Sequence, residues 1–197
     1  MNVLSGFHGA VWLGWLAGVL AAQTAMAIPP MVSHVSDPAG LLATERLGVT
    51  DLEAKLADYE ARTGIRILVQ FHAKSPPADE DRVPGAYMRG LSGQLGTLQH
   101  GVLVVYFADD PDWRIWVGND LAARFAGKPG TVEELTASKA IHEVKEALFS
   151  AAQAKAEATF GALQKASAPG QPPGKAHHLE LWTDALVDAL MARLKAR

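Results

Sequence analysis

The arrangement of apolar and polar residues along the chain predicts three β-strands. Residues 102–107 are apolar throughout, which indicates a central strand that is buried on both faces. A second β-rich run spans residues 65–71, and a third spans residues 113–117. Because only the short turn 108–112 joins the last two strands, they are expected to pair antiparallel. The first two strands are separated by about 30 residues that include a helix, so we expect them to be parallel and joined by a right-handed crossover.

Helical periodicity accounts for most of the remaining chain. Near the N-terminus, Leu52, Leu56 and Tyr59 recur on one helical face, and Gly64 is expected to end that helix. The preceding segment, residues 28–40, is rich in proline, serine and glycine and is expected to be an irregular loop. Helices are predicted over these segments: about 44–62, 85–95, 131–166 and 177–197.

Together these elements predict one α/β domain with a small mixed sheet, followed by a C-terminal helical tail. The domain is expected to span residues 28–166, and the proline- and glycine-rich residues 167–176 are interpreted as a linker. The final helix, residues 177–197, has one apolar side that can fold back on the domain or dock on a partner. This side consists of Leu179, Trp182, Leu186, Leu190 and Leu194.

Residues 1–27 have the pattern of an export signal. They contain no Lys, Arg, Asp or Glu, and an apolar run over residues 11–22 precedes the A-x-A cleavage pattern of residues 25–27. The run is too short to cross a bilayer core of roughly 30 Å as a helix. The usual basic segment before the run is lacking, so an uncleaved anchor and a misassigned start codon stay open as alternatives. We therefore predict an exported protein, located in the periplasm or outside the cell.

Composition narrows the classes of function. The formal net charge is −3, so no basic excess is available to neutralise nucleic-acid phosphates, and we expect no nucleic-acid partner. The chain contains no cysteine, which excludes thiol catalysis and thiolate metal sites. A mature chain of about 170 residues can bury roughly 70% of its unfolded surface, so its stability has to come from a hydrophobic core.

Clustered aspartates are the strongest candidates for a binding site. Asp109, Asp110 and Asp112 lie in the turn after the predicted central strand. Asp37 precedes the first helix, whose start we expect at the same edge of the sheet, where open α/β sheets bind ligands. Carboxylates are the ligands that Ca²⁺ and Mg²⁺ prefer, so Asp37, Asp109 and Asp110 are predicted to hold such a cation. The alternative is structural, with the three clustered aspartates forming a hairpin turn and Asp37 capping a turn.

Other polar and aromatic residues support weaker hypotheses. Trp113 and Trp116 are three apart on a strand and therefore lie on opposite faces, one in the core and one as a candidate partner surface. Arg114, a candidate clamp for a phosphate, is expected to point towards solvent. Residues 142–146 resemble a zinc-protease motif only superficially, because glutamate stands where the second histidine is required.

Several motifs, taken in their order and spacing, resemble the TPM domain family. Residues 35–42 (Val-Ser-Asp-Pro-Ala-Gly-Leu-Leu) resemble the opening of that domain. Residues 101–105 (Gly-Val-Leu-Val-Val) and 114–118 (Arg-Ile-Trp-Val-Gly) resemble its middle, and residues 160–163 (Phe-Gly-Ala-Leu) resemble its closing helix. The resemblance covers residues 32–166 of the chain.

This resemblance implies a three-layer α/β/α sandwich that is exported and often tethered to a membrane. The family includes thylakoid lumen proteins tied to photosystem repair, a receptor-associated protein in nematodes and many bacterial envelope proteins. Weak acid phosphatase activity and divalent-cation binding are associated with some of its members.

The chain departs from the family pattern at positions on which an activity would depend. The family's Gly-x-Gly-Leu-Glu stretch is Gly-Asn-Asp-Leu-Ala here, at residues 118–122. Its Thr-Asp pair is Thr136-Ala137, and the tryptophan of its loop before the second strand is absent from residues 95–97. These losses weaken the transfer of an enzymatic activity from the family to this chain.

We therefore expect a non-enzymatic accessory or interaction module of a cell-envelope assembly, with an envelope or membrane protein as its partner. A weak acid phosphatase that depends on a divalent cation, Ca²⁺ or Mg²⁺, is the alternative. Arg193, Lys195 and Arg197 at the end of the last helix also allow peripheral contact with an anionic membrane surface.

Overall fold

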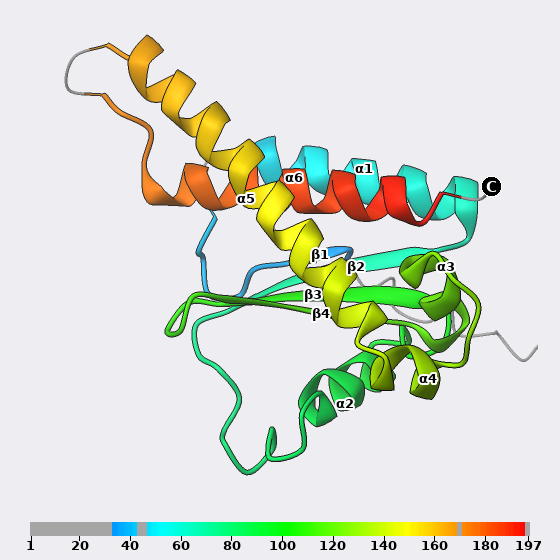
Figure 1. Cartoon of the computed structure of the whole chain (residues 1–197). Helices are drawn as coiled ribbons and strands as arrows, with labels where there is room; N and C mark the ends of the chain where they lie inside the picture. The colour runs from blue at the N-terminus through cyan, green and yellow to red at the C-terminus, as the bar shows by residue number, and fades with distance from the viewer. Residues whose placement is uncertain (1–32, 43–46, 169–170, 196–197) are drawn as a thin grey trace, which may run out of the picture. The chain divides into compact units, whose positions relative to one another are not determined.

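The computed structural model describes residues 33–42, 47–168 and 171–195 (Figure 1). These residues belong to one compact unit. The predicted export signal, residues 1–27, lies outside them. Within the described part of the chain, no helix is both long and apolar enough to cross a membrane.

The described residues contain a mixed sheet of four strands in the order β1-β2-β3-β4. The strands are β1 (Val35–Ser36), β2 (Arg66–His72), β3 (Gly101–Phe107) and β4 (Asp112–Val117). β1, β2 and β3 are parallel, and β4 runs antiparallel to β3. The structure therefore confirms the parallel pair and the antiparallel pair that the sequence predicts.

The sequence does not predict β1, which lies in the segment expected to be an irregular loop. β1 consists of two residues, Val35 and Ser36, which pair with Val69 and Gln70 of β2. Two residues are too few to produce a periodic pattern in the sequence, so this strand can be recognised only by its pairing with β2. β1 matters for the site because it brings Asp37 to the carboxyl edge of the sheet.

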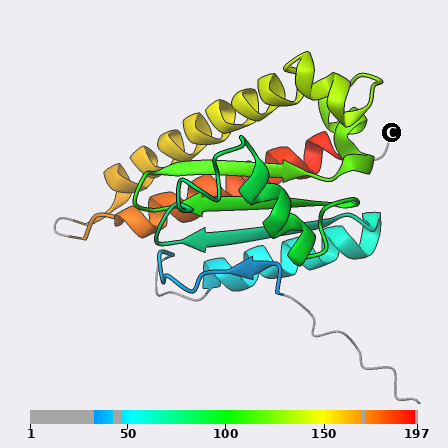
Figure 2. The ribbon, with the colours of Figure 1, turned by 90° about the horizontal axis from the view of Figure 1, so that it is seen from below.

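Helices cover both faces of the sheet and produce three layers. They are α1 (Leu47–Thr63), α2 (Ala86–Gln94), the 3₁₀ helix η1 (Asn119–Leu121), α3 (Ala122–Ala126), α4 (Val132–Ala137), α5 (Ala140–Ala166) and α6 (Lys175–Arg193). α1 and α6 cover one face, and α2 covers the other; α5 packs on α6 and runs beside β4 (Figure 1 and Figure 2). The predicted fold class, an α/β/α sandwich with a small mixed sheet and a C-terminal helical tail, is confirmed.

The two faces of the sheet have separate cores, because successive side chains on a strand point to opposite sides. On the side of α1 and α6, Phe71 of β2 shares a buried cluster with Leu56 and Leu186. On the side of α2, Phe107 of β3 shares a smaller cluster with Met88. Both clusters remove large apolar surfaces from water, at about 25 cal/mol for each Å² buried.

The segment 131–166, which the sequence predicts to be one helix, forms two helices. α4 and α5 are separated by residues 138–139, and Lys139 has the left-handed conformation with φ of 60°. This break places Leu135 of α4 in a small apolar cluster with Ala122 of α3. The prediction was wrong because both halves have helical periodicity and neither proline nor glycine marks the break.

α6, the predicted tail, folds back on the domain. Its apolar side is part of the core next to the sheet, through Leu179, Leu186, Val187, Leu190 and Leu194. On its polar side, Lys55 of α1 forms ion pairs with Asp184 and Asp188. Lys155 of α5 also contacts Asp188, at 3.2 Å. α6 is therefore held by both neighbouring helices.

We predict that Leu186→Ala lowers the free energy of unfolding by about 2–5 kcal/mol, because it leaves a cavity at a fully buried position of α6. The control is Leu163→Ala, a position on α5 that is 37% exposed, and it should change this free energy by less than about 0.5 kcal/mol. Urea unfolding followed by circular dichroism measures both variants. Equal effects of the two substitutions would contradict the packing of α6 in the core.

Candidate functional site

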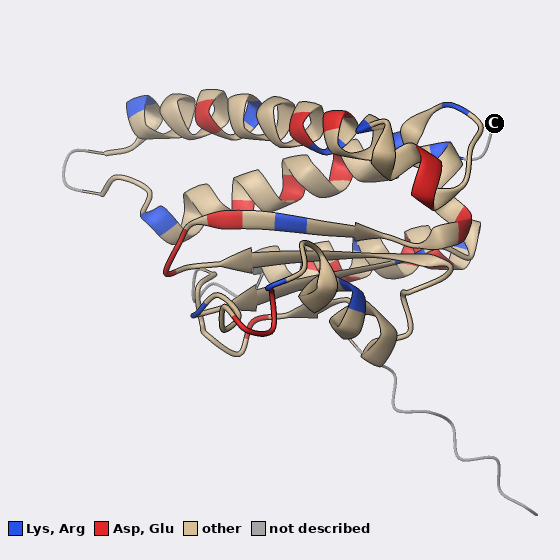
Figure 3. Ribbon diagram, turned by 60° about the horizontal axis from the view of Figure 1, so that its bottom comes forward, with Lys and Arg blue, Asp and Glu red and all other residues tan. Residues whose placement is uncertain are grey.

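The aspartates predicted to bind a cation lie at one edge of the sheet. Asp37 follows β1 and Asp109 follows β3, and these parallel strands end at the same edge. The acidic turn between β3 and β4 is coloured red in Figure 3. Because β2 lies between β1 and β3, the ends of β1 and β3 are roughly 10 Å apart, which is two strand spacings. Asp37 and Asp109 therefore share an edge without being direct neighbours.

The carboxylates at this edge accept hydrogen bonds from nearby backbone N–H groups. Asp37 accepts from the N–H groups of Leu41 and Leu42, at 3.0 and 2.9 Å. Asp109 Oδ1 accepts from the N–H and the hydroxyl of Ser75, at 2.7 and 2.9 Å, and from the N–H of Asp110 at 3.0 Å. Slight desolvation acts to raise the pKa of Asp109, but these hydrogen bonds outweigh it and lower the pKa. Both aspartates thus stabilise turns.

Within the described residues, no three histidine, aspartate or glutamate side chains converge closely enough to hold a metal ion. A Ca²⁺ or Mg²⁺ ion held by Asp37, Asp109 and Asp110 therefore stays a prediction from the sequence. Such an ion would compete with the N–H donors that already bind two of these carboxylates.

Arg114 lies on the α2 side of the sheet and is held there by two carboxylates. Its guanidinium contacts Asp81 at 2.5 Å and Asp112 at 3.1 Å, and its Cζ lies 5.0 Å from the centre of the Phe107 ring. Burial acts to lower the pKa of Arg114, but the two aspartates raise it above its ordinary value. The expectation that this side chain points to solvent is wrong, because the loop between β2 and α2 supplies Asp81.

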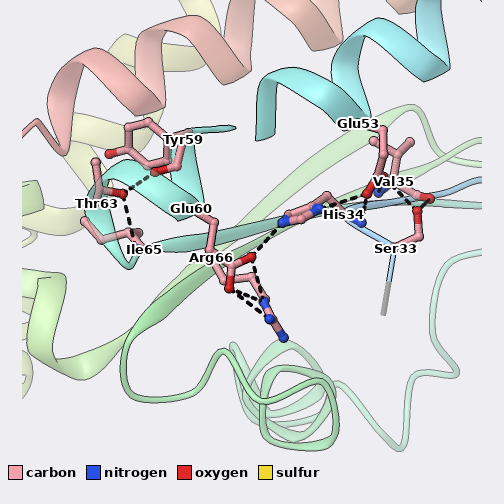
Figure 4. A network of polar contacts seen from close by, with 9 residues as sticks. All are labelled: Ser33, His34, Val35, Glu53, Tyr59, Glu60, Thr63, Ile65 and Arg66. Atoms are coloured by element: carbon pink, nitrogen blue, oxygen red, sulfur yellow. Dashed lines mark hydrogen bonds and ion pairs between the residues drawn. The ribbon is translucent and has the colours of Figure 1, made fainter. Parts of the chain in front are cut away.

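A buried histidine is the centre of a polar network that joins the start of the sheet to α1 (Figure 4). His34 is 8% exposed and lies between two glutamates of α1. Its Nδ1 is 2.8 Å from Glu53 Oε1, and its Nε2 is 2.7 Å from Glu60 Oε2. Glu60 also accepts a hydrogen bond from Arg66 Nε at 2.9 Å, so the network alternates between basic and acidic groups.

Glu53 of α1 forms hydrogen bonds with three consecutive residues at the start of the sheet. It accepts hydrogen bonds from the N–H groups of His34 and Val35 and from the hydroxyl of Ser33. Burial acts to raise the pKa of Glu53, but these bonds and the contact with the His34 ring lower it from an ordinary 4.5 to about 2. Both ring nitrogens of His34 therefore lie against carboxylate oxygens of α1.

Sequence reasoning missed this network because its members are far apart along the chain. His34 is 19 residues from Glu53 and 26 residues from Glu60. One local signal was present: the two glutamates lie about two helical turns apart and therefore share one face of α1. No pattern in the sequence indicates that a histidine from another segment lies between them.

β4 is the outer strand of the sheet, and its outward backbone has no partner among the described residues. The N–H of Gly118 donates to the Gly101 carbonyl at 2.8 Å, so these two residues form a hydrogen-bonded pair of the antiparallel ladder. Since bonded and non-bonded pairs alternate along such a ladder, the N–H and C=O groups of Trp113, Ile115 and Val117 point away from β3. We call this outward side of the strand the β4 edge.

A cavity of about 440 Å³, which we call the β4 cavity, lies along the β4 edge. Its walls come from β4, from α4 and α5, and from α2 with the residues that precede it. Its apolar lining includes Met88, Ile115, Trp116, Ile141 and Phe149. The volume falls within the range of about 300–1,000 Å³ that is typical of ligand-binding pockets.

Two residues that line the β4 cavity carry hydrogen-bond donors without a partner among the described residues. The Nε1 of Trp116 is buried without an acceptor, and Lys145 forms no ion pair. Burial lowers the pKa of Lys145, while the charge of Glu146 acts to raise it. Trp113 belongs to the core on the other face of the sheet, which confirms the prediction that the two tryptophans lie on opposite faces.

Comparisons with known proteins do not show a family for this chain. No family model matches it, and no curated protein matches it. The chain is similar to the solution structure of the N-terminal domain of a protein from P. gingivalis, with 16% sequence identity and a TM-score of 0.45. That likeness covers 82% of this chain and 84% of the other. The resemblance to TPM domains therefore stays a prediction from the sequence.

We predict that the protein loses stability as the pH falls from about 5 to 2, in part through Glu53. The pKa of Glu53 is about 2 in the folded protein and 4.5 ordinarily, so the unfolded chain takes up a proton first as the pH falls. The stabilisation is complete above the ordinary pKa and is lost as the pH approaches the folded pKa. Because 34% of the side chain is exposed, we expect about 1–2 kcal/mol, less than the full difference in pKa would give.

Glu53→Gln should remove this stabilisation at neutral pH and this part of the acid dependence. The matched control is Glu80→Gln, an exposed carboxylate in the loop before α2, which should change neither property. Urea unfolding at neutral and at acidic pH measures both variants. The same acid dependence in Glu53→Gln and in the unmodified protein would contradict the role assigned to Glu53.

Proposed function

We propose that the protein is a non-enzymatic interaction module that binds an extended segment of a partner protein along the β4 edge. The observation that carries this proposal is the outward-facing backbone of Trp113, Ile115 and Val117 beside the β4 cavity. A sheet edge can accept a further strand, whose main chain bonds to the edge while alternate side chains enter pockets.

The β4 edge and the β4 cavity contribute to binding in different ways. Backbone hydrogen bonds to the edge each add a net of about 0.5–1.5 kcal/mol and give little sequence preference. An apolar side chain that enters the cavity next to Trp116 and Phe149 adds about 1.5–3 kcal/mol when fully buried. Affinity therefore depends on the cavity, and the edge sets the extended conformation of the bound segment.

The unpaired donors of the β4 cavity favour an acidic partner. Lys145 can donate to a carboxylate in the cavity, whereas the buried Trp116 Nε1 can do so only after its ring moves. The described residues supply neither with an acceptor. A carboxylate beside Lys145 would offset the cost of burying its ammonium group. The proposed partner segment is therefore extended, with an apolar residue close to an aspartate, a glutamate or a free C-terminal carboxylate.

The surroundings of the β4 edge favour a single peptide strand over a second copy of the sheet. β4 is short and carries Asp112 and Arg114, and short charged strands resist pairing between sheets. α5 also runs beside β4 in Figure 2 and forms a wall of the β4 cavity. A bound segment would lie between the strand and this helix.

The cellular setting in this proposal comes from the sequence. The leader pattern of residues 1–27 supports export to the periplasm or the cell exterior, and the order of motifs supports a TPM-like domain of an envelope assembly. Peripheral contact with a membrane through the C-terminal helix also stays a proposal. Because the apolar side of α6 belongs to the core, such contact would use its basic end.

A weak, cation-dependent acid phosphatase stays the alternative. One observation favours it: Asp37 and Asp109 both lie at the carboxyl edge of the parallel strands, where α/β proteins bind ligands. Such an enzyme needs a divalent cation and a positive group near the phosphate. Arg114, the candidate clamp, already pairs with Asp81 and Asp112.

We predict that the amides of Trp113, Ile115 and Val117 exchange with deuterium at least about tenfold faster than those of Arg114 and Trp116. The reason is that only the latter two bond to β3. A peptide bound at the β4 edge should slow the first group and leave the second unchanged. Equal exchange of both groups in the free protein would contradict the open edge.

The partner chemistry can be tested with peptides selected from a random displayed library. The selected peptides should combine an apolar and an acidic residue, and Thr136→Trp should weaken their binding at least tenfold by placing a bulky side chain in the β4 cavity. Thr159→Trp, at an exposed position of α5 outside the cavity, is the matched control. Binding that Thr136→Trp does not change would place the peptide elsewhere.

The predicted cation site implies a thermal shift. A cation that binds only the folded protein, at a free concentration of about 100 times its Kd, adds roughly 2.7 kcal/mol to the free energy of unfolding. For a chain of this size, this raises the Tm by about 5–10 °C. Excess Ca²⁺ or Mg²⁺ should produce this shift relative to a chelator, and Asp109→Asn should abolish it. Phosphate release that needs the same cation and the same aspartate would favour the phosphatase over the interaction module.

A further inference from the structure

A second cavity, of about 430 Å³, lies between the loop after α3 and the end of α6. Four basic side chains line it: Arg124, Lys128, Arg193 and Lys195. Basic residues coloured blue gather near the C-terminal end of the chain in Figure 3. We call this feature the basic pocket.

The charges of the basic pocket are not balanced within the described part of the chain. None of its four basic side chains forms an ion pair there, whereas Lys55, Arg66 and Arg114 each contact a carboxylate. This local excess stands out because the formal net charge of the whole chain is −3. Cations held close together repel one another, so an anion between them would relieve this repulsion.

One wall of the basic pocket is fixed in position by the backbone. Arg193 Nε donates to the carbonyl of Phe125 at 2.6 Å, which orients the guanidinium and leaves its other N–H groups available. The Arg193 guanidinium also lies against Gly127, where a Cβ would be 2.6 Å from Arg193 Nη2, so a larger residue would shift this side chain. The φ of Gly127 is +73°, a left-handed conformation that favours glycine.

Helix capping explains part of this arrangement. Arg124 lies near the end of α3 and Arg193 near the end of α6, where cations interact favourably with the helix dipole. It does not explain Lys128 and Lys195, which follow the helices rather than belong to them. Nor does capping require that side chains from two segments line one cavity.

We propose that the basic pocket binds an anion that carries a phosphate group. Arginine guanidinium groups bind phosphate oxygens in a bidentate fashion, and the two lysines add charges that need no fixed geometry. The cavity has room for the phosphate and for part of the group that carries it. This proposal is independent of the peptide site, because the residues that line the two cavities are different.

The phosphate can come from a phospholipid head group or from a soluble phosphate ester, and two probes distinguish these sources. The first is a titration of the protein with inorganic phosphate and pyrophosphate at low salt, followed by NMR at the amides of Gly127 and Lys128. The second is co-sedimentation with vesicles of phosphatidylglycerol and phosphatidylcholine, compared with phosphatidylcholine alone. Screening by salt should weaken both interactions.

The test variant is the double substitution Arg124→Gln with Lys128→Gln, which leaves Arg193 and its bond to Phe125 in place. The matched control is Arg89→Gln with Lys165→Gln, which removes the same charge at exposed positions outside the basic pocket. Circular dichroism and the Tm establish that both variants are folded.

We expect the test variant to raise the Kd for phosphate or for anionic vesicles at least tenfold and the control to change it less than twofold. Saturation by soluble phosphates without vesicle binding identifies a soluble ester as the ligand. Vesicle binding that depends on Arg124 and Lys128 identifies the lipid head group. Equal loss in both variants, or binding of neither probe at low salt, overturns the proposal.

Discussion

The burial of β3 on both faces is the constraint on which the rest of the structure depends. Val102–Val105 have no exposed surface, so helices have to cover the sheet from both sides. α2 comes before β3 in the chain and covers one side, whereas α6 follows β4 and covers the other together with α1. To reach that side, the chain passes the β4 edge, and Figure 1 shows α5 crossing in front of the strands. The β4 cavity is the space that this crossing leaves between strand and helix.

Features that are encoded locally were predictable, and features that depend on distant partners were not. The apolar run of β3 and the short turn to β4 determine two strands and their antiparallel pairing without further information. β1 exists only because β2 pairs with it, and the break at Lys139 exists because α4 turns to meet α3. The sequence pattern of residues 131–166 is equally compatible with a straight helix, so only the packing distinguishes the two.

The candidate sites show the same division. Residue type and topology were enough to place Asp37 and Asp109 at one edge of the sheet. That β2 lies between them and keeps them apart follows only from the strand order in the structure. The network around His34 and the basic pocket combine residues from remote segments, which no local pattern connects. The two proposed binding sites thus lie where polar groups of the described residues are unpaired: backbone groups at the β4 edge, and basic side chains where α3 and α6 end.

The two stretches that contain the departures from the TPM-like pattern have structural roles here, through neighbouring residues that keep the pattern. A Cβ at Gly118 would lie 2.4 Å from the carbonyl oxygen of Gln99, and the side chain of Asn119 bonds to that of Gln99 at 3.0 Å. This stretch therefore fixes how the chain leaves β4. Thr136 stands where the family has the threonine of its Thr-Asp pair, and it lines the β4 cavity. A residue that keeps the family pattern therefore borders the cavity proposed for the partner segment.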